Sequence, residues 1–184
     1  MAIPDFDANS VMPPHLGDPT KSAEISPYPC TTLELCDKFS TSGERIQILD
    51  GLLRLRDRLR NAGMTDGFQW LDGSFLEDVE HARGRPPGDI DVVTFYWSPD
   101  VDITKKLVAS FPDLLDRAKI KADFFVDHFP IDVGYRPELT VEATRYWCSL
   151  FSHTRSGVWK GMLRIDLNTI ADDNDALAFL AKKP

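Results

Sequence analysis

Three things are scarce in this chain of 184 residues: long apolar runs, cysteines and an excess of basic charge. No stretch approaches the roughly 18 consecutive apolar residues of a membrane-spanning helix, so no membrane partner is expected. The cysteines, Cys30, Cys36 and Cys148, are odd in number and form no CxxC pair, which favours reduced thiols in the cytoplasm. The acidic N-terminal segment MAIPDFDANSV lacks the apolar stretch of a secretory signal. The net charge of −8 argues against a general nucleic-acid coat protein, but leaves room for an enzyme that contacts RNA through a local basic patch.

The overall composition is that of a globular protein, with 42% hydrophobic and 27% charged residues. The length suits one domain with a substantial core, or one domain with a tail. Residues 1–30 contain six prolines, which predicts an extended arm that wraps over the domain or stays mobile. Residues 31–184 are predicted to form a single domain.

Hydrophobic periodicity predicts helices and strands that alternate along this domain. Apolar residues recur at helical spacing from Ile46 to Leu59, behind a Thr41–Glu44 stretch that resembles a capping box. Other helices are predicted at 31–39, at 103–119 with a break near Pro112, at 138–151 and at 173–182. Strands are predicted at 68–71, 90–97, 122–126 and 162–167. The order favours an α/β or α+β fold, with helices packed on a mixed β-sheet.

Two short motifs at the ends of predicted strands contain the residues that are candidates for binding metal and phosphate. Asp89 and Asp91 are two residues apart at a strand start, so their side chains are expected to share one face of the sheet. Two such carboxylates repel each other unless a cation lies between them, and a hard divalent ion such as Mg²⁺ or Mn²⁺ suits oxygen ligands. Gly73 allows backbone N–H groups to approach an anion closely, and Ser74 adds a hydroxyl donor. A helix starting at Phe75 would also favour phosphate through its dipole.

The pair of motifs resembles the signature of the nucleotidyltransferase superfamily, which has the polymerase-beta-like fold. More narrowly, the segments SPYPCTTLELCDKF, WLDGSF, DIDVV and KGMLRIDL resemble a family of small, largely uncharacterised bacterial proteins placed in that superfamily. The resemblance extends from about Pro13 to Leu167. The loop between Ser74 and Asp89 is long and contains several basic residues, so its phosphate geometry is expected to differ from that of better-known members.

The resemblance implies transfer of a nucleoside monophosphate from a nucleoside triphosphate to a hydroxyl acceptor, with pyrophosphate leaving. Gly73 and Ser74 would hold the β- and γ-phosphates, and Asp89 and Asp91 would hold two Mg²⁺ or Mn²⁺ ions. In the superfamily, a third carboxylate from a later strand completes the site. Asp123 is the candidate for this role, as ligand of the catalytic metal and helper in deprotonating the acceptor, and Asp127 is its alternative.

The resemblance also suggests partners. Arg155 and Lys160, around the turn before the last strand, are candidates for binding phosphate or the acceptor. The acceptor would be a protein side chain or an RNA end, because the chain has no room for a large acceptor-binding domain. Small members of the superfamily often work in toxin–antitoxin or defence systems, so a partner protein is expected.

Two other classes of function fit the same residues. A catalytically silent fold would bind a nucleotide or a partner protein, and no third carboxylate would meet Asp89 and Asp91. A structural interaction domain would carry the aspartates incidentally, and no triphosphate would stabilise it in a metal-dependent way. Structural roles are predicted for the four histidines, for Trp70, Tyr146 and Trp147 in the core, and for Arg54, Arg56 and Arg60 on a solvated helix face.

Overall fold

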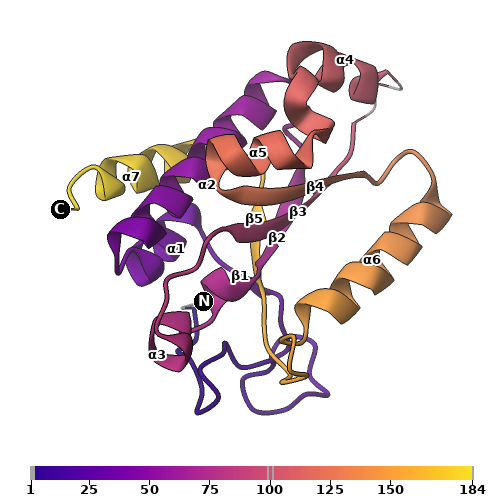
Figure 1. Cartoon of the computed structure of the whole chain (residues 1–184). Coiled ribbons are helices and arrows are strands. Elements are labelled where there is room, and N and C mark those ends of the chain that lie inside the picture. Colours follow the sequence, from indigo (N-terminus) through magenta and orange to yellow (C-terminus); the bar gives the residue numbers. More distant parts are fainter. Residues whose placement is uncertain (1–2, 99, 101, 184) are drawn as a thin grey trace.

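The structure, a computed structural model, describes residues 3–98, 100 and 102–183 (Figure 1). Its helices are α1 (Thr32–Phe39), α2 (Gly43–Asn61), α3 (Val79–Arg83), α4 (Ile103–Ser110), α5 (Arg117–Phe124), α6 (Pro137–Phe151) and α7 (Ile170–Leu180), with short 3₁₀ turns η1 (Ser74–Leu76) and η2 (Pro112–Leu115). Its strands are β1 (Tyr28–Pro29), β2 (Gly67–Asp72), β3 (Ile90–Tyr96), β4 (Val126–Asp132) and β5 (Leu163–Asp166).

The strands form one mixed sheet in the order β1-β5-β2-β3-β4. β1 runs parallel to β5 and β3 runs parallel to β4, whereas β2 is antiparallel to both of its neighbours. The predicted α+β class with a mixed sheet is therefore confirmed. The helix predicted at 46–59, the strands predicted at 68–71 and 90–97 and the break near Pro112 are all present.

Helices cover the two faces of the sheet unequally. In Figure 1, α1, α2, α5 and α7 lie together on one side of the sheet, while α6 lies apart from them beside β4. The larger core, which includes Leu71, Ile90 and Val92, lies under the first group of helices. A smaller aromatic core on the other face contains Trp70, Val93, Phe95, Trp147, Phe151 and Met162. Because side chains alternate along a strand, residues that share a face with Trp70 and Val93 point toward α6.

The strand predicted at 122–126 is wrong, because those residues complete helix α5 and begin β4. The side chain of Asp116 accepts a hydrogen bond from the Lys119 N–H at the start of α5. Phe125 ends the helix in the left-handed conformation, with a φ of 57°. The strand that follows starts only at Val126. The boundary shift decides which aspartate faces the candidate site, as described below.

Helix α2 begins differently from the prediction. Its N-cap is Ser42, whose hydroxyl accepts from the Arg45 N–H, and the reciprocal capping box lies instead at Thr31 and Glu34 at the start of α1. In the middle of α2, Gly51 lies against the Phe124 carbonyl at the end of α5, where a Cβ would clash with the backbone. The glycine therefore allows α2 and α5 to pack closely, which fixes α5 against the sheet.

The interpretation of Arg56 as a solvated residue is wrong, since only 2% of it is exposed. Its guanidinium pairs with Asp173 of α7 at 3.1 Å and donates to the Gln69 side chain at 2.6 Å. Arg60 also pairs with Asp173, whereas Arg54 lies at the surface as predicted. A buried ion pair thus joins α2 to the terminal helix.

The N-terminal arm, described from residue 3 onward, lies along the domain. Met12 is fully buried, and its carbonyl accepts from the Gly161 N–H at 2.8 Å. The Ser10 carbonyl accepts from the Asp78 N–H at 2.9 Å, and β1 at the end of the arm joins the sheet through β5. The arm therefore braces the loop that follows Ser74 and the segment that leads into β5. Among the described helices, none is both long enough and apolar enough to cross a bilayer.

His128 of β4 gives a prediction for the pH dependence of stability. Burial lowers the pKa of its imidazole to about 3, against about 6.5 in an unfolded chain. Between these values only the unfolded chain binds the proton, so His128 makes stability fall below about pH 6.5, by about 1.4 kcal/mol per pH unit. His128→Gln retains a hydrogen-bonding group for Thr94, which contacts His128 Nε2 at 2.8 Å, but it cannot titrate. Urea unfolding at several pH values should give a flatter acid limb for this variant, and an unchanged slope would contradict the assignment.

Candidate functional site

Three aspartates form a row across adjacent strands on the α6 face of the sheet. Asp72 of β2 is the pairing partner of Asp91 in β3, and Asp91 is the pairing partner of Asp127 in β4. Side chains of directly paired residues lie on the same face, so the three carboxylates point the same way. Together with Asp89 they line one pocket of about 600 Å³. The shared face predicted for Asp89 and Asp91 therefore belongs to a larger acidic row.

The ionised form of Asp91, the central carboxylate, is disfavoured by burial and by neighbouring acids. Burial raises the pKa of Asp91 to about 6, and repulsion from Asp89 and Asp127 adds to the rise, while Lys121 and Lys160 oppose it. A carboxylate surrounded by like charges gains stability when a cation comes between them. The donor set consists of oxygen atoms, which fits Mg²⁺ or Mn²⁺. Asp89, Asp91 and Asp127 are therefore the residues that could hold a divalent ion, although the described residues contain no group of three or more His, Cys, Asp or Glu side chains already placed to bind a metal.

Two basic residues of α5 contact the acidic row directly. Arg117 donates to both carboxylate oxygens of Asp127, at 2.9 and 3.0 Å, and Lys121 forms a salt bridge with Asp89. Arg117 and Lys121 are four residues apart, so they lie on the same side of the helix. The sequence interpretation did not include either residue in the site.

Gly73 is needed for the position of Asp91. Its φ of 87° and ψ of −172° fall in a region that is essentially restricted to glycine. A Cβ at this position would lie far inside van der Waals distance of Asp91 Oδ2. Gly73 therefore lets the strand β2 turn away while the Asp91 carboxylate packs against its backbone.

Gly73→Ala is expected to destabilise the protein by roughly 1–3 kcal/mol, because the alanine strains the backbone and displaces Asp91. Because Asp91 is displaced, the affinity of the Gly73→Ala variant for Mn²⁺ should fall as well. Thermal melting and Mn²⁺ titration would measure the two effects. Gly43→Ala is the matched control, since Gly43 lies in α2 and a Cβ there meets nothing within 4 Å. Equal stabilities for the two variants would contradict the role given to Gly73.

Ser74 lines the pocket, but no α-helix starts at Phe75, where one would have added its dipole to the site. Ser74–Leu76 form the 3₁₀ turn η1, and the five-residue helix α3 starts only at Val79. The expected helix-dipole contribution to phosphate binding is therefore not supported. The groups at the turn that could still contact a phosphate are the Ser74 hydroxyl and the backbone around Gly73.

Lys160 and Arg155 both line the pocket, in different ways. Lys160 is buried, and its ammonium lies 3.0 Å from both Asp72 Oδ1 and Glu77 Oε1 and donates to the Gly73 carbonyl at 3.3 Å. Burial raises the pKa of Asp72, and the adjacent Lys160 opposes that rise. Lys160 therefore neutralises acids beneath the turn rather than standing free for phosphate, whereas Arg155 is exposed at the pocket.

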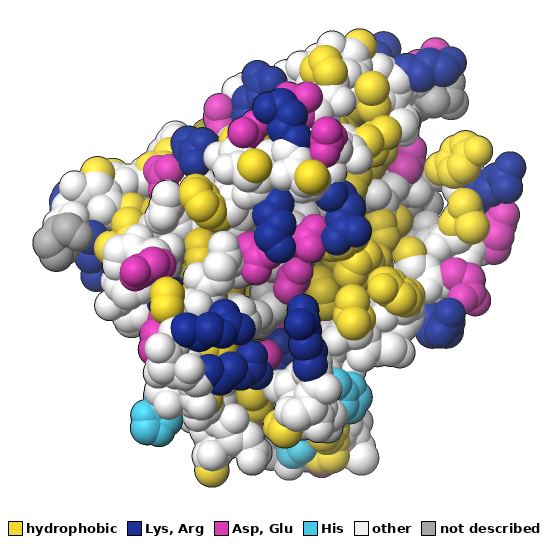
Figure 2. All heavy atoms as spheres, viewed as in Figure 1, with side chains coloured by type: hydrophobic (Ala, Val, Ile, Leu, Met, Phe, Trp, Pro, Cys, Tyr) yellow, Lys and Arg dark blue, Asp and Glu magenta, His cyan; other side chains and the backbone are white. Residues whose placement is uncertain are grey.

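Basic side chains frame the pocket. Figure 2 shows acidic side chains near the middle of this face, with Lys and Arg above and below them and hydrophobic side chains to the right. Besides the α5 residues, the lining includes Arg83, Arg85 and Arg155. Arg83 pairs with Glu77 at 2.9 Å, while Arg85 and Arg155 make no salt bridge within the part of the chain that the structure describes. Arg85 and Arg155 are therefore the rim cations best placed to meet an anionic ligand.

Asp123 does not join the site. It lies on α5, where it pairs with Lys119 at 2.8 Å, and it is not part of the pocket lining. The physical reason is the helical conformation of residues 117–124, which directs Asp123 away from β3. Asp127, the alternative, is the residue that meets Asp91, although on a strand that does not contain Asp123. The i,i+4 spacing of Lys119 and Asp123 is the sequence signal that could have indicated the helix.

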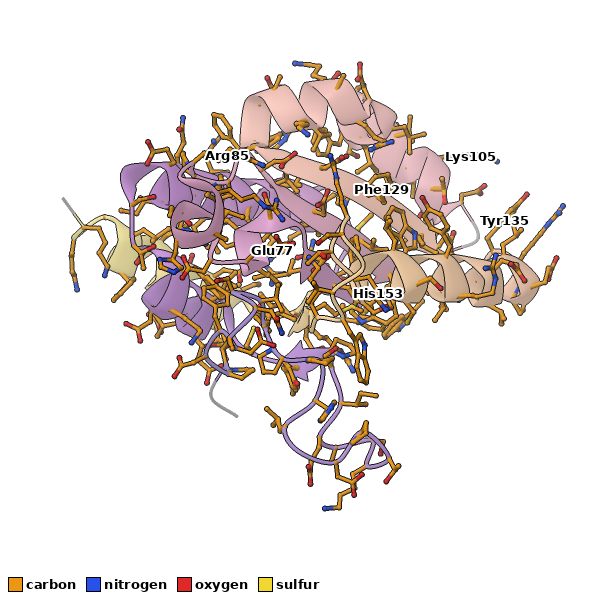
Figure 3. The ribbon with its side chains drawn as sticks, turned by 60° about the horizontal axis from the view of Figure 1, so that its bottom comes forward. Glu77, Arg85, Lys105, Phe129, Tyr135 and His153 are labelled. Carbon is orange, nitrogen blue, oxygen red and sulfur yellow. The ribbon has the colours of Figure 1, made fainter. Side chains whose placement is uncertain are left out.

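An aromatic wall borders the acidic row, and the sequence interpretation missed it. Phe129 follows Asp127 by two residues and so shares its face, and its ring centroid lies 4.3 Å from that of Trp147 in α6. Trp147 is buried as predicted, but Tyr146 is 52% exposed and lines the pocket rather than the core. In Figure 3, Phe129, Glu77, Arg85 and His153 lie around the middle of the molecule, and Lys105 and Tyr135 lie at its far end.

Comparison with known proteins identifies one family. No curated protein and no solved structure matches this chain. Residues 4–166 match a family of unknown function, DUF6932, and this range contains every pocket residue described above. The match covers well over half of the sequence. The chain therefore belongs to the DUF6932 family of unknown function.

Proposed function

We propose that the chain is a Mg²⁺- or Mn²⁺-dependent nucleotidyltransferase. One observation carries the proposal: Asp91 and Asp127 are paired in neighbouring parallel strands, beside Asp89 and the Gly73-Ser74 turn. The resemblance of the two motifs to the nucleotidyltransferase superfamily calls for a third carboxylate from a later strand. Asp127 occupies a position that meets this requirement, and Asp123 does not.

The residues around the pocket supply the further features that such a reaction needs. Asp89, Asp91 and Asp127 would hold the metal, which when bound stabilises charge on the phosphate and activates the acceptor hydroxyl. Arg85 and Arg155 add positive charge at the rim, where a triphosphate would be held. Phe129, Tyr146 and Trp147 provide an apolar wall suited to a planar base.

The acceptor would be a protein side chain or an RNA end. A cytoplasmic location and a partner protein, as in toxin–antitoxin or defence systems, belong to this proposal through the resemblance alone. The net charge of −8 suits a site-limited contact with RNA better than broad coating of it.

A catalytically silent nucleotide-binding module of the same fold is the second candidate. The specific observation that favours it is the pairing of Asp89 with Lys121 and of Asp127 with Arg117. A carboxylate row already neutralised by side chains could bind a nucleotide at the basic rim without holding a metal.

Labelled nucleotides distinguish the two candidates. The protein would be incubated with Mg²⁺ and each nucleoside triphosphate carrying label on either the α- or the γ-phosphate, with RNA and protein acceptors present. Nucleotidyl transfer places α-label on an acceptor and γ-label in pyrophosphate. Binding without release of either label would support the silent module, and transfer of γ-label to an acceptor would contradict both candidates.

A further inference from the structure

We propose that Arg117 and Lys121 form an exchangeable basic pair, which holds the carboxylates in the metal-free protein and turns to the triphosphate once metal is bound. The inference rests on the proposed function, since it assigns a metal to the acidic row. It adds two residues to the site and predicts that metal and triphosphate bind cooperatively.

The contacts place both cations where a metal ion would compete with them. Arg117 contacts both oxygens of Asp127 through Nη2 at 2.9 and 3.0 Å, and Lys121 pairs with Asp89. Asp91 is paired with Asp127 in the row and is two residues from Asp89, and it has no salt bridge in the described residues. Asp89, Asp91 and Asp127 together with Arg117 and Lys121 carry one net negative charge, while Asp72, the fourth acid, is paired with Lys160. This group is therefore close to neutral without metal and would become positive if a divalent ion entered and both cations stayed.

The cations are more exposed than the acids that they contact. The side chains of Arg117 and Lys121 are 57% and 52% exposed, against 17% for Asp127 and 20% for Asp89. Asp127 lies on strand β4 and Asp89 directly precedes β3, while the basic side chains extend from the surface of α5. Ion pairs in which one partner is exposed to water contribute little to stability. A divalent ion can thus displace the cations without disturbing the sheet.

A released Arg117 would stay beside the pocket. Its guanidinium carbon lies 4.0 Å from the centroid of the Phe129 ring, a stacking contact that does not depend on Asp127. Both α5 residues line the pocket together with Arg85 and Arg155. The geometry therefore gives the freed cations a second anionic partner, the phosphates of the nucleotide.

The test compares Lys121→Met and Arg117→Met with Lys119→Met. Lys119 lies on the same helix and pairs with Asp123 and Asp113, outside the pocket, so it controls for loss of one positive charge on α5. Mn²⁺ binding to each protein alone would be measured by the electron paramagnetic resonance of free Mn²⁺. Binding of tripolyphosphate at saturating Mg²⁺ would be measured by calorimetry, and circular dichroism would confirm that each variant is folded.

The expected effects have opposite signs. Each pocket variant should bind Mn²⁺ about two- to fivefold more tightly than the wild type, as loss of a competing ion pair predicts. Each should bind tripolyphosphate about tenfold more weakly, and Lys119→Met should match the wild type in both measurements. Mn²⁺ affinity equal to or below that of the wild type in both pocket variants would overturn the exchange while leaving the proposed function intact. A wild type that binds no Mn²⁺, even with tripolyphosphate present, would overturn the proposed function as well.

Discussion

Asp91→Asn is expected to lower the affinity for Mn²⁺ by at least about a hundredfold and to abolish nucleotide transfer. Asp91 is the central member of the row, paired across the sheet with both Asp72 and Asp127. Loss of residues that merely support metal ligands commonly costs ten- to a hundredfold in affinity or activity, so loss of a ligand should cost at least as much. Mn²⁺ titration and the α-label assay would measure the two effects.

Asp123→Asn is the matched control, because Asp123 lies outside the pocket and its substitution should change neither measurement.

Stability provides a second check on Asp91→Asn. The pKa of Asp91 is about 6 in the folded protein and about 3.9 in an unfolded chain, so stability falls as the pH rises between these values, and the ionised carboxylate remains a cost above them. Without metal at pH 7.5, the variant should therefore melt no lower than the wild type. A large loss of stability would show that Asp91 is primarily a structural residue.

Asp173→Ala is expected to destabilise the protein by about 3–5 kcal/mol, because it leaves a buried arginine charge without its partner. Arg56 and Asp173 are 2% and 3% exposed, and Thr32 also donates to Asp173, at 3.1 Å. Such a loss is a large fraction of the 5–15 kcal/mol by which folded domains are usually stable. Chemical denaturation would measure it.

Asp175→Ala serves as the control, since Asp175 lies on the same helix and is exposed. The double variant Arg56→Met/Asp173→Leu should recover part of the lost stability, because it removes the unpaired charge along with its partner. Recovery would be incomplete, since Gln69 loses the hydrogen bond from Arg56. If Asp173→Ala proved as stable as the Asp175→Ala control, the proposed contribution of the Arg56–Asp173 ion pair would be contradicted.

Local sequence patterns were sufficient to predict part of the candidate site. The two-residue spacing of Asp89 and Asp91 at the start of a strand implied a shared face, and both residues line the pocket. The apolar run after Asp89 indicated a buried strand, and residues 90–96 form β3 with most of its side chains buried. Each of these inferences depends on neighbouring residues only.

Features set by distant residues could not be predicted in this way. Whether Asp123 or Asp127 meets Asp91 depends on where α5 ends, and helix boundaries respond to capping and packing more than to composition. The burial of Arg56 depends on a partner 117 positions away. Lys160 looked like a free cation because its partners, Asp72 and Glu77, lie more than eighty positions before it.

The most direct test of the central claim is a thermal-shift panel of the four nucleoside triphosphates, each with and without Mg²⁺, on the wild type and Asp91→Asn. A ligand at a hundredfold excess over its Kd adds about 2.7 kcal/mol of stability when it binds the folded state alone. The account predicts a Mg²⁺-dependent rise in melting temperature with at least one triphosphate, and its loss in Asp91→Asn. A rise that is independent of Mg²⁺ and survives the substitution, or no rise with any triphosphate, would contradict it.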